Sequence, residues 1–179
     1  MGNMHKVFIS FHSEDMYYKQ EFEKLFHHSA QVLISRAVDV GDIKDGLQDD
    51  TIRQKIRDEY LRDSSVTIVL IGEKTWQRKH VDWEISSSIR DTEYNPRSGL
   101  LGIFLPTYPG YAERKYSKRT IPPRLAANVD CGFAKLYAWT ENSEQIQNWV
   151  HEAYLAKRKI LPDNSYPSFI NNRSGSGWS

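Results

Sequence analysis

The amino-acid sequence predicts an α/β fold, with a parallel five-stranded sheet and helices on both of its faces. Short apolar runs rich in β-branched residues alternate with longer amphipathic segments, which is the pattern of βαβ units. The central run, residues 65–72, is apolar almost throughout, as expected for a strand that is buried on both faces. Right-handed crossovers between parallel strands then favour the flavodoxin-like strand order 2-1-3-4-5.

Five short runs carry the strand signal, and turn-forming residues bound them. Four runs are mostly apolar, whereas the last run alternates and contains Lys135, which indicates a strand at a sheet edge. An extension of the second strand through residues 37–40 is left open. The expected strands are residues 6–11, 31–35, 65–72, 100–105 and 133–139.

Four segments between and after these runs carry apolar residues at helical spacing. Ser13 is the expected N-cap of the first segment, and Thr140 or Asn142 is that of the last. Residues 107–132 contain three prolines and several basic residues, so they are expected to form a long, mostly irregular connection. The expected helices are residues 15–28, 50–61, 73–93 and 143–159.

The composition is that of an ordinary globular domain. Of 179 residues 39% are hydrophobic, and the formal net charge of +1 gives no reason to expect a nucleic-acid or membrane partner. The single cysteine, Cys131, excludes an intrachain disulfide framework, and no metal site is predicted. No run is long enough to span a bilayer and no signal peptide is recognisable, so we expect a cytoplasmic protein.

The chain is expected to form one domain over residues 1–160, because its 179 residues are enough for one compact domain, and it has no internal repeat. Residues 161–173 are polar and are expected to be a loosely ordered C-terminal tail. Residues 174–179, Ser-Gly-Ser-Gly-Trp-Ser, read as a flexible linker that runs into the start of a purification tag, and they are left out of functional reasoning.

Glu84 is the main candidate for a functional residue. It stands between Trp83 and Ile85, in the helical segment that follows the central strand. Open α/β sheets bind ligands at the carboxyl ends of their strands, and the predicted topology brings residues 11–15 to the start of this helical segment. From the local sequence alone, a solvated helix residue is the simpler interpretation of Glu84.

Several catalytic motifs are missing. The turn after the first strand has no glycine-rich phosphate loop, which disfavours nucleoside triphosphatases and Rossmann dehydrogenases. No Gly-x-Ser-x-Gly elbow is present, which disfavours an α/β-hydrolase. Ser10, His12 and Asp15 lie close in sequence and leave a nucleophile triad open, although such triads are defined by geometry rather than by sequence order.

Three features together resemble one family. Residues 7–15, Val-Phe-Ile-Ser-Phe-His-Ser-Glu-Asp, are similar to box 1 of TIR domains, and residues 65–72 resemble the TIR strand that leads to the catalytic helix. Glu84 then falls where enzymatic TIR domains keep their glutamate. The spacing and residues 78–85 most resemble TIR-like proteins of the ThsB type, from Thoeris anti-phage systems. The resemblance covers residues 5–158 and implies a TIR-type fold.

The resemblance implies an enzyme that consumes NAD as its substrate, with no bound cofactor. ThsB-like proteins cleave the nicotinamide–ribose bond of NAD and make a cyclic ADP-ribose isomer, a diffusible nucleotide signal that activates a partner effector. Glu84 would be the catalytic carboxylate, and Phe11, His12 and Ser13 would line the nucleotide pocket. The number of copies in the active assembly is left open, and a homo-oligomer is one outcome.

The sequence departs from the family pattern at His80. Many enzymatic TIR domains carry tryptophan four residues before the glutamate, whereas this chain has His80 there and Trp76 and Trp83 nearby. His80 is expected to bind substrate by stacking on a base, or one of the two tryptophans takes that role. The loop of residues 39–49, which in the family covers the site, lacks an aromatic residue.

Two rival functions stay open. The first is a non-catalytic TIR interaction module that assembles through the loop after the second strand and neighbouring helices. The second is a flavodoxin-like hydrolase of nucleosides that uses Ser10 or His12 and does not act on NAD.

Overall fold

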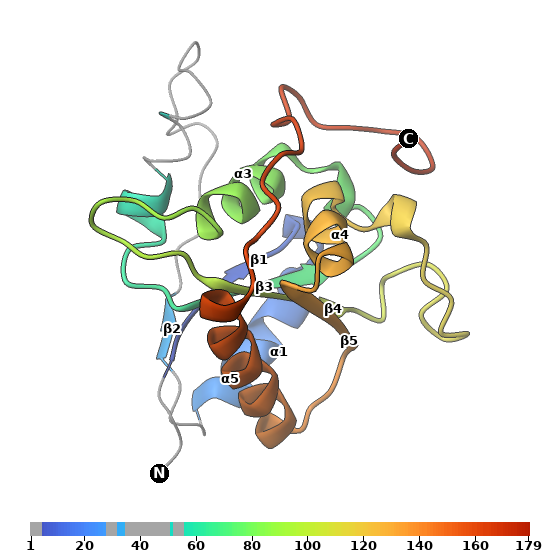
Figure 1. Ribbon diagram of the computed structural model, residues 1–179. Coiled ribbons are helices and arrows are strands. Elements are labelled where there is room, and N and C mark those ends of the chain that lie inside the picture. Colours follow the sequence, from blue (N-terminus) through green and yellow to red (C-terminus); the bar gives the residue numbers. More distant parts are fainter. Residues whose placement is uncertain (1–4, 28–31, 35–50, 52–55) are drawn as a thin grey trace.

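The computed structural model contains a parallel sheet of strands in the order β2-β1-β3-β4-β5 (Figure 1). The structure describes residues 5–27, 32–34, 51 and 56–179. The predicted α/β class with a parallel sheet is therefore confirmed. The strands are β1 (Lys6–Ser10), β2 (Val32–Ile34), β3 (Val66–Ile71), β4 (Gly99–Phe104) and β5 (Ala134–Ala138).

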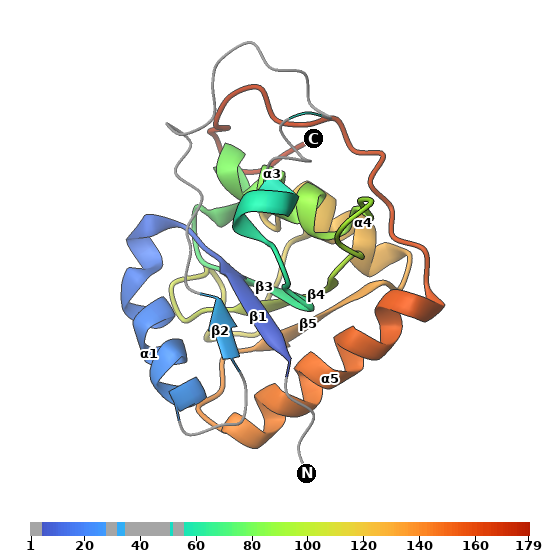
Figure 2. The same cartoon turned by 90° about the vertical axis from the view of Figure 1, so that its left-hand side faces the viewer.

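Helices cover both faces of the sheet, with α1 and α5 on one face and α3 and α4 on the other (Figures 1 and 2). Short 3-10 turns lie at Ser13–Asp15, Thr75–Gln77 and Lys118–Thr120, and a π-helical turn lies at Ile56–Tyr60. The α-helices are α1 (Met16–His27), α3 (Lys79–Ser88), α4 (Pro123–Asp130) and α5 (Ser143–Lys159).

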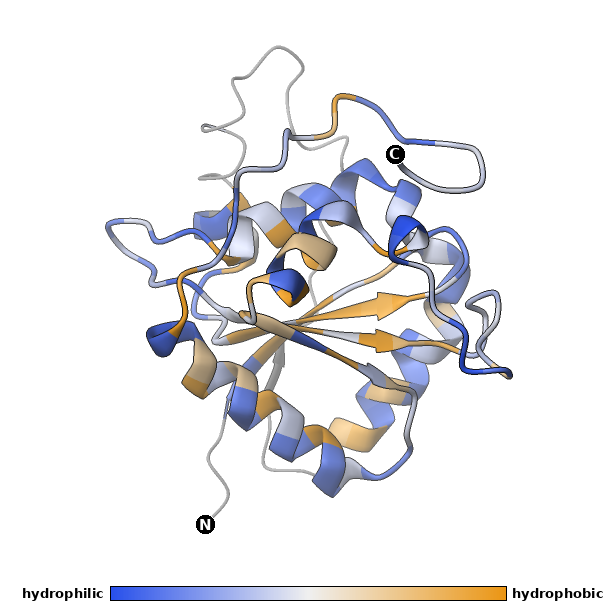
Figure 3. Ribbon diagram, turned by 45° about the vertical axis from the view of Figure 1, so that its right-hand side comes forward, coloured by the Kyte–Doolittle hydropathy of each residue, from blue (hydrophilic) through white to orange (hydrophobic). Residues whose placement is uncertain are grey.

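Each face of the sheet has its own hydrophobic cluster, because alternate side chains of a strand point to opposite faces. On β3, Ile68 and Leu70 pack with residues of α1 and α5. Val69 and Ile71 pack instead with residues of α3 and α4. The strands are accordingly the most hydrophobic part of the fold, as Figure 3 shows.

Strands β3 and β4 are buried along their whole length, as the continuous apolar runs predict. Strand β5 is buried only at its first residue, and the Lys135 side chain is 67% exposed. This exposure agrees with the expected position of Lys135 at a sheet edge.

Helix α4 corrects the expectation that residues 107–132 form a mostly irregular connection. Pro123 occupies the first turn of this helix, where a missing backbone N–H costs nothing because it would have no partner within the helix. Leu125 and Ala126 are buried against the cluster that α3 and α4 share. The Pro122-Pro123 pair thus marks the start of a helix, although in the sequence it resembles a helix breaker.

Helix α3 is shorter than the expected helix of residues 73–93. A 3-10 turn precedes it, and after Ser88 the Ser88 carbonyl accepts a hydrogen bond from Ser98 N at 2.7 Å. Of the expected helix 50–61, residues 50 and 52–55 lie outside the described residues. The proposed strand extension 37–40 and the loop 39–49 lie outside them too. None of the helices in the described part of the chain has the length and apolar character that a membrane span requires.

The segment after α5 runs past α3 and α4 (Figure 1). Asn164 Nδ2 donates to the Ser86 carbonyl at 3.0 Å, Phe169 is buried, and Trp178 Nε1 donates to the Ile121 carbonyl at 2.7 Å. The division of the chain into a domain, a tail and a tag remnant stays a prediction. The tail nevertheless has more contacts with the domain than its polar sequence indicates.

Candidate functional site

Helix α3 packs against β1 and β3 and is held near both of its ends. Near its start, His80 Nε2 lies 3.0 Å from the Phe11 carbonyl oxygen, just after β1. At its end, the Ser88 hydroxyl lies 2.7 Å from the Thr67 hydroxyl on β3. Helical residues four apart share one face, so Glu84, midway between His80 and Ser88, faces the sheet at β1 and β3.

Glu84 is buried, with 2% of its surface exposed. The Ser88 hydroxyl donates a hydrogen bond to the Glu84 carbonyl at 2.7 Å, and this bond leaves the Ser88 oxygen to accept from Thr67. These bonds fix the helix turn that carries Glu84. The interpretation of Glu84 as a solvated helix residue is therefore wrong.

Ser10, at the end of β1, lies on the same side of the sheet as Glu84. It pairs in register with Val69, which packs in the cluster of α3 and α4, and residues in register on parallel strands point to the same face. Ser10 is fully buried, and its hydroxyl has no hydrogen-bond partner among the described residues. A buried hydroxyl without a partner costs free energy, which makes Ser10 a candidate to contact a bound ligand.

The His80 ring has a defined tautomer. A carbonyl oxygen only accepts hydrogen bonds, so the contact with Phe11 requires the proton on Nε2 and leaves a lone pair on Nδ1. Burial lowers the pKa of His80, while the bond to the Phe11 carbonyl partly raises it. His80 is therefore neutral at pH 7 and can accept a hydrogen bond or a proton through Nδ1.

His12 caps the turn after β1. Its Nδ1 accepts a hydrogen bond from Glu14 N at 3.0 Å, so His12 rather than the expected Ser13 is the cap. Burial lowers the pKa of His12, and the nearby positive charge of Arg78 lowers it further. Ser13 is exposed, and its hydroxyl lies 3.3 Å from the His12 ring.

Asp15 forms a second buried acidic group at the carboxyl ends of the strands. It accepts a hydrogen bond from the Thr107 hydroxyl at 2.8 Å, and burial raises its pKa. Gly72, directly after β3, makes room for it, since a Cβ at this position would lie 2.1 Å from Asp15 Oδ2. Asp15 thereby links the segments that follow β1, β3 and β4. The glycine that ends the central strand was a usable sequence signal for this close approach.

The sequence-predicted site residues are brought together only in part. His80 and Glu84 share a helix face. His12 is close enough to His80 and Arg78 for their positive charges to lower its pKa, and Arg78 also lowers the pKa of His80. The Phe11 ring instead packs in the cluster of α1 and α5, on the opposite face of the sheet, although its carbonyl meets His80. The assignment of Phe11, His12, Ser13 and His80 to substrate binding stays a prediction.

The two tryptophans near Glu84 are buried and occupied by protein contacts. Trp83 Nε1 donates to the Phe169 carbonyl at 3.0 Å, and Lys79 Nζ lies 4.7 Å from the centre of the Trp83 ring. Trp76 is 3% exposed. Trp83 thus holds the tail against α3, a role that the sequence did not indicate.

Asp82 also connects α3 to the rest of the fold. Its carboxylate accepts from Arg124 Nε on α4 at 3.0 Å and from Phe169 N in the tail at 3.0 Å. Both members of the ion pair are almost completely buried, with side chains 0% and 2% exposed for Arg124 and Asp82. Asp82 and Trp83 stand directly before Glu84, so the tail and α4 hold the helix turn that leads into it.

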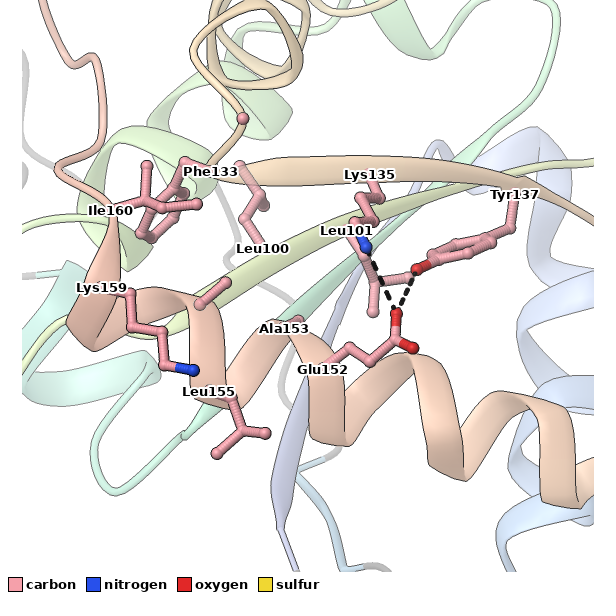
Figure 4. Close-up of a pocket in the computed structure, with 12 residues that line it drawn as sticks. Leu100, Leu101, Phe133, Lys135, Tyr137, Glu152, Ala153, Leu155, Lys159 and Ile160 are labelled. Carbon is pink, nitrogen blue, oxygen red and sulfur yellow. Dashed lines mark hydrogen bonds and ion pairs between the residues drawn. The ribbon is translucent and has the colours of Figure 1, made fainter.

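An apolar cavity of about 250 Å³ lies elsewhere, between β5 and α5 (Figure 4). At one end of the cavity Glu152 accepts a hydrogen bond from the Tyr137 hydroxyl at 3.3 Å and pairs with Lys135 at 3.5 Å, and Lys159 lies at the other end. Burial raises the pKa of Tyr137 to about 12. None of the residues that line this cavity belongs to β1 or α3, so it is separate from the Glu84 site.

The site around α3 thus combines a buried carboxylate, a buried hydroxyl and a neutral imidazole, a set of groups that can stabilise positive charge and accept a proton. Residues 8–109, more than half of the chain, match a family model described as Thoeris protein ThsB, TIR-like domain. A comparison with curated proteins finds no match.

Proposed function

Because the chain belongs to the family of the TIR-like domain of Thoeris protein ThsB, we propose that it is an anti-phage defence enzyme that cleaves NAD. The observation that carries this proposal is the position of Glu84, buried on the face of α3 that packs on β1 and β3. In the proposed reaction the nicotinamide–ribose bond breaks and neutral nicotinamide leaves, taking the bonding electrons.

The proposed reaction requires a carboxylate beside the ribose, but it does not require a general acid. The pyridinium nitrogen already carries positive charge, so nicotinamide leaves as a neutral molecule without being protonated. The ribose carbon becomes oxocarbenium-like, as in glycoside hydrolysis. Glu84 stabilises this positive charge and binds the ribose hydroxyls, and its burial strengthens the interaction by excluding water.

A hydroxyl of the same molecule then attacks the ribose carbon and closes a cyclic ADP-ribose isomer. This hydroxyl must lose its proton, and the free Nδ1 of the neutral His80 ring is a suitable acceptor, as is the Glu84 carboxylate. If water attacks instead, the product is linear ADP-ribose. The cyclic product would reach its effector by diffusion, so the chain itself needs no stable complex with that partner.

The test is to incubate the purified protein with NAD and to separate the products by chromatography with mass detection. Nicotinamide together with a compound of cyclic ADP-ribose mass supports the proposal in full. Nicotinamide with linear ADP-ribose supports NAD cleavage but replaces the cyclase with a glycohydrolase. Intact NAD at high protein concentration, with phage components added, contradicts the proposal.

A non-catalytic interaction module is the second candidate, favoured by the cavity between β5 and α5 (Figure 4). This cavity is mostly apolar and lies beside the edge strand, where another chain has access. Substituting Leu155, which is exposed and lines the cavity, with glutamate would separate the two functions. If the chain is an interaction module, the Leu155→Glu variant should lose self-association, and neither the wild-type chain nor the variant should turn over NAD.

A further inference from the structure

A second cavity, of about 440 Å³, lies between the last turn of α5 and the segment that joins α3 to β4. It is at the amino ends of the strands, since β4 begins at Gly99, whereas His80 meets Phe11 at the carboxyl end of β1. It is therefore distinct from the Glu84 site. The charged residues that line it are Asp91, Arg97, Lys157, Arg158 and Lys159.

Positive charge dominates this cavity. Its one carboxylate, Asp91, is already used by Arg97, which forms an ion pair with it at 2.8 Å and donates its backbone N–H to it at 2.7 Å. The three cations at the end of α5 thus face the cavity without a carboxylate of their own on its walls. The fully buried Arg57 adds a further positive charge nearby.

Lys157 is the unusual member of this group. It is only 8% exposed, and no carboxylate among the described residues lies within ion-pair distance of its ammonium. The ammonium lies 4.6 Å from the centre of the Tyr154 ring, which stabilises it only in part. Burial lowers the pKa of Lys157, and the positive charges of Arg158 and Arg57 lower it further, while the negative charge of Asp91 partly raises it. An anion in the cavity would relieve this cost.

The simpler explanation is that cations at a helix C-terminus complement the helix dipole. This explanation suits Arg158 and Lys159, which are exposed at the end of α5. The helix dipole does not explain why Lys157 is buried. It also does not account for Arg97, which reaches the same cavity from a different segment.

We propose that this cavity binds the phosphate group of a small phosphorylated molecule. The volume is in the range of small-molecule sites, about 300–1,000 Å³. Lys157 contacts the phosphate from the wall of the cavity, and Arg158 contacts it from the rim, where guanidinium geometry suits phosphate oxygens. The site does not depend on NAD turnover, because none of its residues belongs to α3 or β1.

The experiment is calorimetric titration of the full chain at constant ionic strength with two probes, inorganic phosphate and AMP. The Lys157→Met variant removes the buried ammonium but keeps the aliphatic chain, and we expect it to weaken binding about tenfold or more. The matched control is Lys135→Met, which removes an exposed lysine on β5, and it should change the affinity less than about twofold. Tighter binding of AMP than of phosphate indicates a nucleotide ligand, and the reverse indicates free phosphate.

A second variant keeps the proposal testable if Lys157→Met does not fold. Arg158→Gln changes an exposed side chain and should weaken binding about threefold. The proposal is overturned if neither probe binds the wild-type chain saturably. It is also overturned if Lys157→Met and Lys135→Met weaken binding equally, because such binding would reflect overall charge. AMP binding that Glu84→Gln abolishes and Lys157→Met leaves unchanged would place the ligand in the other site and would likewise overturn the proposal.

Discussion

The buried ion pair between Asp82 and Arg124 gives the sharpest test of how the Glu84 helix is held in place. Asp82 lies on α3 two residues before Glu84, and it binds both Arg124 on α4 and Phe169 N in the tail. The Asp82→Asn substitution preserves the shape of the side chain but removes its charge. Arg124, which is completely buried, then keeps a positive charge with no ionic partner at this position.

The magnitude follows from burial. Removing one partner of a buried ion pair costs about 3–5 kcal/mol, because the remaining charge stays in a medium of low polarity. Asp82→Asn keeps an oxygen acceptor and Arg124 also donates to Asn164 at 2.8 Å, so we expect a loss near the lower limit, about 3 kcal/mol. This is a large part of the roughly 5–15 kcal/mol that stabilises a typical domain.

The assay is urea unfolding followed by circular dichroism, with the free energy of unfolding extrapolated to water. The double variant Asp82→Asn/Arg124→Met removes both charges, so it should be less destabilised than Asp82→Asn alone. Asp130→Asn is the control, since it breaks the exposed pair of Asp130 with Lys118 and should cost less than about 1 kcal/mol. Equal losses for Asp82→Asn and Asp130→Asn would refute the reasoning.

Three further predictions concern the ends of the elements. Gly72→Ala would place a Cβ 2.1 Å from Asp15 Oδ2, so it should lower the free energy of unfolding by about 1–3 kcal/mol, and a second change, Asp15→Ala, should recover part of this loss in urea unfolding. Asn142→Ala removes the side chain that accepts from two N–H groups at the start of α5, which should cost about 1 kcal/mol in the same assay. Burial lowers the pKa values of His12 and His80 below 6.5, so between the lowered values and 6.5 the unfolded chain binds more protons. The free energy of unfolding should therefore rise with pH across this window, and the rise should shrink when both residues are changed to glutamine.

The sheet was predictable because its signal is local. The runs that become β3 and β4 are apolar almost throughout, which is typical of strands buried on both faces. The N-cap of α5 was also predictable, since Asn142 stands directly before an amphipathic segment and accepts two N–H groups there.

Features that depend on tertiary contacts were not predictable from sequence. Helix α4 is stabilised by burying Leu125, and no periodic pattern long enough to reveal it follows Pro123. The ion pair of Asp82 with Arg124 joins residues 42 positions apart, and neither has a local signal. The tail is held in the same way, through the bond of Phe169 N to Asp82.

The structure places Glu84 on the buried face of α3, and its role as the catalytic carboxylate stays a prediction. The resemblance to TIR domains predicts that role from the distance between Glu84 and the central strand. The burial of Ser10 could have been predicted from the alternation of β1, where Ser10 points to the opposite face from Ile9 and Phe11. The bond between His80 and the Phe11 carbonyl depends on how α3 docks on β1, which the sequence does not specify.

The most direct measurement is the rate of nicotinamide release from NAD by the wild-type chain, by Glu84→Gln and by Glu93→Gln. Glu93 is an exposed glutamate just after α3, so its substitution controls for the loss of a carboxylate. The proposed function predicts that Glu84→Gln abolishes turnover with an unchanged circular dichroism spectrum, while Glu93→Gln retains the wild-type rate. Turnover of NAD by a folded Glu84→Gln variant at the wild-type rate would contradict the central claim.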